Sequence, residues 1–211
     1  MDIDMLDLNS IFYVVVLIMS VVVHEVAHGY AALYFGDKTA EYAGRLTFNP
    51  LKHLDWFGSV VLPLILVLTS ASFLVGWAKP VPYNPANLRD KKWGTVWVAS
   101  AGILANILIA LFFGVVIRVS LITGIFSDTF ISLLSSIVLL NIVLALFNLM
   151  PIPPLDGSKI IFTLLPHRFS FIERFFEKYS LVLLLIFVFF IWGFIAGIIP
   201  PIYTLLTGLP L

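Results

Sequence analysis

The chain has 211 residues, of which 61% are hydrophobic and only 11% are charged, whereas soluble domains carry about 25% charged residues. This composition excludes an ordinary soluble domain and predicts an integral membrane protein that forms a single unit over residues 1–211. The formal net charge of zero gives no guide to partners, and we predict no nucleic-acid partner. Because cysteine is absent, disulfides and thiolate metal sites are excluded, and a metal would need His, Asp, Glu or water as ligands.

The N-terminal residues 1–7 lack the basic start and cleavage site of a signal peptide. Five apolar stretches dominate the chain. Each stretch is close to the roughly 20 residues that span a bilayer. We therefore predict an all-α polytopic membrane protein with about four spanning helices plus one re-entrant or fifth apolar helix. The five stretches are 11–35, 57–76, 93–118, 130–149 and 181–199.

The first stretch contains the sequence HEVAH at residues 24–28, which is an HExxH motif. On a helix, positions i and i+4 share a face, so His24 and His28 can direct two imidazoles at one metal ion. Glu25 lies beside them and can take a proton from water that the metal activates. Burying these groups in an apolar helix is costly unless they have partners, which favours a metal site over a purely structural polar cluster.

The second stretch, 57–76, either spans the membrane or dips in and returns. With a re-entrant segment, eleven of the twelve Lys and Arg residues fall on one side, whereas a span divides them eight to four. The positive-inside rule favours the re-entrant arrangement, with the three basic segments in the cytoplasm. Pro63 and the polar residues that follow it fit this arrangement, but a kinked span remains an alternative.

Two connecting segments follow the first and second stretches. Residues 41–50 contain Gly44 and an alternating Leu46 and Phe48, which predicts either a short β-like hairpin near the catalytic helix or a plain loop. An edge strand there could hold an unwound peptide in extended form. Residues 76–85 include three prolines within six residues, which predicts an extended, helix-free connection.

The third and fourth stretches each carry polar groups among aliphatic residues. Small residues at positions 101, 102 and 105 allow close helix contact, and Asn106 is typical of an interhelical hydrogen bond. The fourth stretch leads through three prolines to Asp156 and Gly157, which indicates a carboxylate held in place. We predict Asp156 as the third metal ligand, which leaves a fourth position open for water, as in catalytic zinc sites.

Together these motifs resemble the site-2 protease family of intramembrane zinc metalloproteases, in its compact prokaryotic branch. The resemblance rests on HEVAH at 24–28, the Gly-x-x-x-Asn segment at 102–106, the GWAKPVP loop at 76–82 and the Asn-x-x-Pro-x-Pro-x-Leu-Asp-Gly signature at 148–157. It implies that His24, His28 and Asp156 bind zinc and that Glu25 is the general base. It also implies that Asn106 and Asn148 help hold the substrate strand or polarise its carbonyl. The chain departs from the family at Ile103, where proline is frequent, and in having no PDZ-like insertion.

The resemblance implies an enzyme that binds one Zn²⁺ per chain and cuts transmembrane segments of protein substrates. We expect a multi-pass protein of the cell (inner or plasma) membrane, surrounded by lipid, with an active site open to the cytoplasm. Two other functions remain open, a membrane zinc transporter and a non-catalytic relative that only binds membrane helices. The sequence also leaves homo-oligomerisation open.

Overall fold

A computed structural model describes residues 8–61, 65 and 78–211 of the chain. Within these residues the regular elements are all helical, as predicted. The α-helices are α1 (Leu8–Tyr34), α2 (Thr39–Tyr42), α4 (Lys91–Thr123), α5 (Asp128–Asn148), α6 (Asp156–Leu164), α7 (Ser170–Lys178), α8 (Ser180–Ile186), α9 (Trp192–Ala196) and α10 (Ile199–Thr207). The short 3₁₀ and π segments are η2 (Pro50–Lys52), η3 (Trp56–Val61), η4 (Pro85–Asn87), η5 (His167–Phe169) and η6 (Phe187–Ile191).

Three of these helices are long and apolar enough to cross a membrane: Ile11–Tyr34, Lys91–Thr123 and Asp128–Asn148. A fourth span results if His167–Lys178 and Ser180–Ala196, which are bent by 74° relative to each other, are counted as one. The described helices therefore give three to four spans, and the chain is a multi-pass membrane protein. Residues 62–64 and 66–77 lie outside the described part, so the re-entrant or spanning course of 57–76 stays a prediction.

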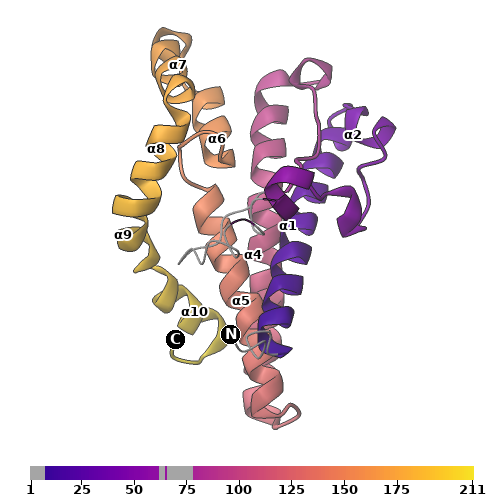
Figure 1. The fold of residues 1–211 in the computed structure, drawn as a ribbon, viewed down its shortest axis with the longest axis vertical. Coiled ribbons are helices and arrows are strands. Elements are labelled where there is room, and N and C mark those ends of the chain that lie inside the picture. The colour runs from indigo at the N-terminus through magenta and orange to yellow at the C-terminus, as the bar shows by residue number, and fades with distance from the viewer. Residues whose placement is uncertain (1–7, 62–64, 66–77) are drawn as a thin grey trace.

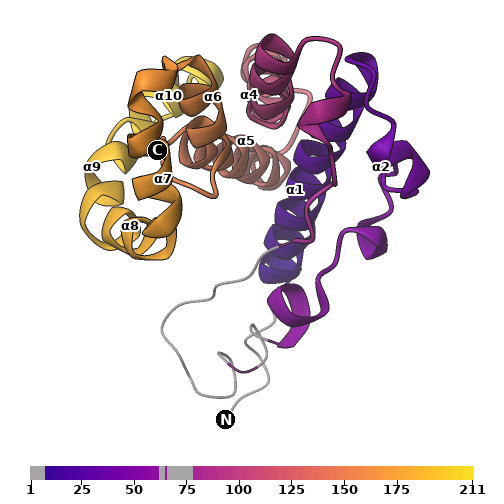
Figure 2. The same ribbon diagram turned by 90° about the horizontal axis from the view of Figure 1, so that it is seen from above.

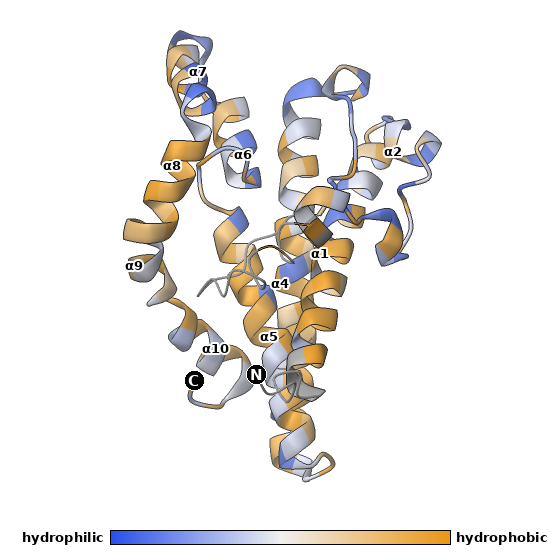
Figure 3. Cartoon of the chain, viewed as in Figure 1, coloured by the Kyte–Doolittle hydropathy of each residue, from blue (hydrophilic) through white to orange (hydrophobic). Residues whose placement is uncertain are grey.

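The outward faces of these helices carry large apolar side chains. Ile122 and Phe194 are each 85% exposed, and Phe189 is 71% exposed. Apolar surface on this scale is unfavourable in water but suits contact with lipid tails. Figure 3 shows hydrophobic residues along the helices, with hydrophilic residues gathered near α2, the start of α4 and α7.

Helix α4 is the centre of the fold, since it contacts α1, α5, α6 and α10. Figures 1 and 2 show α1, α4 and α5 together, with α7 to α9 standing apart on the far side of α5. The side chain of Asp90 caps the start of α4 by accepting from the N–H of Trp93, and Gly124 ends the helix at a φ of 66°. The helix is unbroken at Ile103.

Buried apolar residues from α4, α5 and α10 form the largest core cluster. Ile117 of α4, Val138 of α5 and Tyr203 of α10 are almost completely buried within it. In a bilayer such contacts depend on close packing of helices rather than on removing apolar surface from water. This cluster joins the C-terminal helix to the two helices that support the site described below.

The structure does not confirm the predicted β-like hairpin at residues 41–50. Helix α2 ends at Tyr42, Gly44 turns the chain at a φ of 62°, and residues 45–49 form a loop. Only an isolated antiparallel bridge joins Leu54 to Ala78 among the described residues. The alternation of Leu46 with Phe48 is too short to specify a strand, and Leu46 instead lies against Gly29 of α1. Of the segment 76–85, which the prolines predict to be free of helix, residues 78–84 contain no helix, Pro85 begins η4, and residues 76–77 lie outside the described part.

A buried aspartate ties the end of α1 to this proline-rich segment. The carboxylate of Asp37 accepts hydrogen bonds from the N–H and hydroxyl of Thr39, the N–H of Asn84 at 2.6 Å and the side-chain amide of Asn87 at 3.0 Å. Burial alone would raise the pKa of Asp37, but these donors hold it below its ordinary value. Asp37 thus anchors the C-terminal end of the proline-rich segment to the end of α1.

Candidate active site

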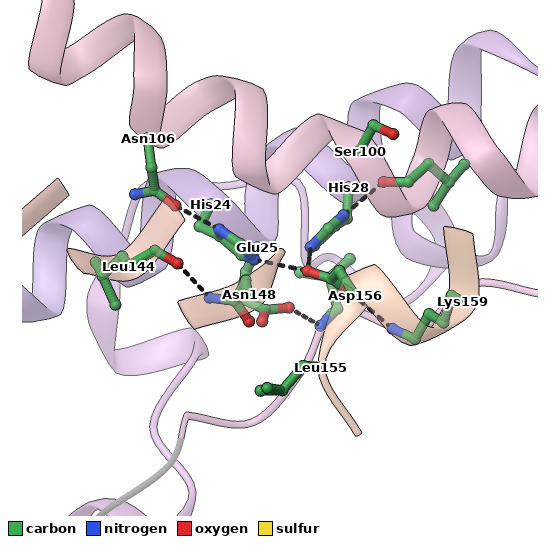
Figure 4. Close-up of polar contacts among 12 residues, drawn as sticks. His24, Glu25, His28, Ser100, Asn106, Leu144, Asn148, Leu155, Asp156 and Lys159 are labelled. Carbon is green, nitrogen blue, oxygen red and sulfur yellow. Dashed lines mark hydrogen bonds and ion pairs between the residues drawn. The ribbon is translucent and has the colours of Figure 1, made fainter. Parts of the chain in front are cut away.

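Three predicted ligands converge at one point, although Asp156 follows His24 by 132 residues. His24 and His28 lie one turn apart on α1, and Asp156 is the first residue of α6. The Oδ2 atom of Asp156 lies 3.0 Å from Nε2 of His24 and 3.0 Å from Nε2 of His28. All three side chains are buried, and one possible ligand atom from each lies within 4.8 Å of the others. Figure 4 shows the two imidazoles directed at the carboxylate.

The hydrogen bond made by Nδ1 of His28 favours a cation between the ligand atoms. Its Nδ1 lies 2.6 Å from the backbone carbonyl of Val98, and because a carbonyl can only accept, Nδ1 must carry a proton. In the neutral imidazole, Nε2 then holds a lone pair, and this buried atom makes no hydrogen bond. It faces a carboxylate oxygen, so two electron-rich atoms meet. A metal ion between them would satisfy both, and two imidazoles with one carboxylate form a ligand set of catalytic zinc.

Gly102 of α4 forms the wall behind the two imidazoles. A Cβ atom at this position would lie 2.5 Å from Nε2 of His24 and 2.5 Å from Nε2 of His28. Such distances are far shorter than a van der Waals contact between carbon and nitrogen. Helix α4 can therefore approach the imidazoles this closely only because residue 102 is glycine. The close helix contact that the small residues predict is thus made at the ligand atoms themselves.

The carboxylate of Asp156 is held from both sides. Its Oδ1 accepts from Nζ of Lys159 at 3.0 Å, while Oδ2 faces the histidines. A Cβ at Gly157 would collide with the backbone carbonyl of Leu149, so only glycine lets α6 begin against the end of α5. The ammonium group of Lys159 beside Oδ1 favours the charged form of this buried carboxylate. The group is therefore an anion ready to bind a cation.

Glu25 lies beside the ligands and is half-buried. The backbone N–H of Val81 donates to its Oε2 at 2.8 Å, which fixes the orientation of the carboxylate. The preceding carbonyls, of Lys79 and Pro80, accept from the buried guanidinium of Arg45 at 2.7 and 3.3 Å. Arg45 and Asp37 thus anchor the same segment from its two sides, and the proline-rich segment presents one N–H to Glu25.

The sequence profile of peptidase family M50 matches residues 12–129 and 117–191, which together are most of the chain. The chain belongs to this family. Two curated relatives agree: "Putative zinc metalloprotease YwhC" of Bacillus subtilis is 42% identical over 74% of this chain and 69% of its own length. "Putative zinc metalloprotease Rip2" of Mycolicibacterium smegmatis is 32% identical over 66% of this chain and 52% of its own length. No solved structure matches the chain.

Membership of the M50 peptidases makes the chain a metalloprotease, and the metal that the family implies is zinc. The buried ligand set of two imidazoles and one carboxylate fits this ion. The predicted resemblance to the site-2 proteases is thus confirmed. The roles of the individual residues remain proposals, which the geometry above supports.

The two asparagines predicted to hold the substrate lie in different surroundings. Asn106 of this M50 protein is fully buried, and its Oδ1 lies 2.5 Å from Nδ1 of His24. These contacts favour a role in orienting His24, and its contact with substrate stays a prediction. Asn148, at the end of α5, is half-buried and donates to the carbonyl of Leu144 at 3.0 Å. Its predicted contact with substrate is also untested.

Sequence reasoning missed several residues that complete the site. Lys159 lies three residues after Asp156 on α6, and this helical spacing is a signal that could have revealed it. Val81 contacts Glu25 through its backbone N–H, and Arg45 holds the residues before Val81 through the carbonyls of Lys79 and Pro80. No sequence pattern specifies such contacts. Asn141 is also fully buried and accepts a hydrogen bond from Asn106.

Proposed function

We propose that this M50 metalloprotease cuts its substrates within the membrane, at peptide bonds of transmembrane segments. The observation that carries the proposal is the position of the metal ligands. His24 and His28 lie within the apolar span Ile11–Tyr34, pressed against a second span at Gly102. Ionisable groups inside a membrane helix are costly, so they are typically retained for function. A peptide that reaches them must enter the space between membrane helices.

In the proposed reaction, Glu25 is the general base. A bound zinc ion would lower the pKa of a water molecule and polarise the substrate carbonyl. Glu25 takes the proton of the attacking water and later passes it to the leaving amine. The Val81 N–H holds one oxygen of Glu25 and leaves the carboxylate oriented for this transfer. Lys159 keeps Asp156 anionic, so the ligand stays available for the ion.

A transmembrane substrate must unwind before it can react, because a helix keeps its carbonyls in internal hydrogen bonds. We propose that Asn148 holds the unwound strand, since it lies half-buried where α5 leads towards Asp156. Water would reach the site from the hydrophilic end of the molecule, where α2, the start of α4 and α7 lie (Figure 3). The basic residues of these segments support a cytoplasmic location of that end, by the positive-inside rule, in a protein of the cell membrane.

The proposed function predicts where substrates are cut. The purified protein is reconstituted in liposomes with a peptide that has one transmembrane segment flanked by soluble tails, and the products are mapped by mass spectrometry. We expect new termini inside the apolar segment, loss of cleavage after zinc is chelated, and recovery when zinc is returned. Cuts confined to the soluble tails would contradict intramembrane cleavage, and cleavage that survives chelation would contradict the zinc mechanism.

A further inference from the structure

A chain of uncharged polar groups runs from α5 to His24 through the interior of the three-helix group. It joins Asn141 of α5, Ser20 of α1 and Asn106 of α4, and all three residues are buried. The amide nitrogen of Asn141 donates to the Ile137 carbonyl at 2.9 Å and to the hydroxyl of Ser20 at 2.9 Å. The amide nitrogen of Asn106 donates to Oδ1 of Asn141 at 2.8 Å. This series of hydrogen bonds ends at Nδ1 of His24.

The directions of these hydrogen bonds follow from one fixed end. The Ile137 carbonyl can only accept, so the amide of Asn141 must turn its nitrogen towards it and its oxygen towards Asn106. Asn106 must then turn its nitrogen towards Asn141. The Ser20 carbonyl, 3.5 Å from the same nitrogen, can also only accept and favours the same orientation.

The orientation of Asn106 sets the tautomer of His24. Because the amide nitrogen faces Asn141, Oδ1 of Asn106 faces Nδ1 of His24, which must carry a proton to donate to it. Nε2 of a neutral His24 is then unprotonated, and this is the atom that faces Asp156. An unprotonated nitrogen is what a metal ligand requires.

We propose that Asn141 is a positioning residue of the metal centre, which acts through Asn106 to keep His24 in the tautomer that binds zinc. This inference rests on the proposed metal site. The hydrogen bonds of Asn141 go to Asn106, Ser20 and Ile137 and not to the ligands. We therefore assign its effect on the His24 tautomer to the Asn106 amide. Without an acceptor at residue 141, that amide can flip and turn its nitrogen to Nδ1, which would favour the proton on Nε2 and oppose metal binding.

The test compares the zinc affinity of three variants with that of the wild type by competition with a chelator. Asn141→Leu removes the acceptor and should weaken zinc binding about 10- to 100-fold, the usual effect of losing an outer partner of a ligand. Asn141→Asp should stay near the wild type, because a neutral carboxyl group can donate to Ile137 and accept from Asn106. Ser20→Ala should also stay near the wild type, since the Asn141 nitrogen keeps its bond to Ile137.

If Asn141 only stabilises the fold, the zinc affinities of the variants should follow their thermal stabilities. Asn141→Asp, which buries an acidic group, should then weaken zinc binding most. The absorption spectrum of the Co²⁺-substituted protein gives a second readout, and it should change for Asn141→Leu but not for Asn141→Asp. If the leucine variant does not fold, Asn141→Ser, whose hydroxyl is too short to reach both neighbours, replaces it with the same expectation.

The outcomes separate this inference from the proposed function. If a folded Asn141→Leu variant binds zinc as tightly as the wild type, the inference is wrong and the metal site still stands. The same holds if Asn141→Asp loses as much zinc affinity as Asn141→Leu. A wild-type protein that binds no zinc overturns the metal site, and the inference with it.

Discussion

Glu25→Gln is expected to abolish peptide cleavage while the amount of bound zinc stays unchanged. Glutamine has the same shape, and its side-chain oxygen can still accept from the Val81 N–H. It has no basic oxygen to take a proton, so the general-base contribution of about 10²- to 10⁴-fold in rate is lost. The measurement is the cleavage rate of a transmembrane peptide in liposomes, together with the zinc content of the same preparation.

Glu41→Gln is the matched control, because Glu41 is an exposed residue of the short helix α2. The same change of a carboxylate to an amide there should leave both the rate and the zinc content as in the wild type. If Glu25→Gln cleaved the peptide as fast as Glu41→Gln, Glu25 would not be the base. If it lost zinc as well as activity, its role would lie in holding the metal centre together.

Gly102→Ala is expected to remove zinc from the protein and cleavage with it. The added methyl group would lie 2.5 Å from Nε2 of both His24 and His28, so the imidazoles or the helix must move. Alanine is favoured over glycine within a helix by about 1 kcal/mol, so the substitution strengthens α4 itself. We expect zinc affinity to fall by at least the roughly 10- to 100-fold that loss of an outer ligand partner causes.

A second glycine gives the control for this change. Gly193 lies within α9, and a Cβ atom there would have no heavy atom within 4 Å, apart from its neighbours in the helix. Gly193→Ala should therefore leave zinc affinity and cleavage unchanged. A Gly102→Ala protein that binds zinc as tightly as Gly193→Ala would show that α4 can move away from the imidazoles, and that its close packing at Gly102 does not shape the metal site.

The sequence predicts the parts of the fold and site that depend on local pattern. The apolar runs at 11–35, 93–118 and 130–149 became the spans Ile11–Tyr34, Lys91–Thr123 and Asp128–Asn148, with ends that differ by a few residues because helices extend to their caps. The histidine pair was predictable because helical geometry alone places positions 24 and 28 on one face.

The remaining contacts depend on which helices meet, and a single sequence does not encode this locally. Asn141 is one polar residue in an apolar stretch, and its link to His24 exists only because α1, α4 and α5 pack together. The choice between a hairpin and a plain loop at 41–50 also depends on the tertiary fold. Two alternating apolar residues suit a strand, but Leu46 fills the space above Gly29 instead, and that space is created by the tertiary fold.

The central claim is that His24, His28 and Asp156 together bind one zinc ion per chain, and zinc coordination tests it most directly. X-ray absorption at the zinc edge, with the metal content of the purified protein, should show one zinc per chain bound by nitrogen and oxygen at about 2.0–2.2 Å. The spectrum should require two imidazoles, and Asp156→Ala should lower the zinc content. An Asp156→Ala protein with the same zinc content and spectrum as the wild type would contradict the claim.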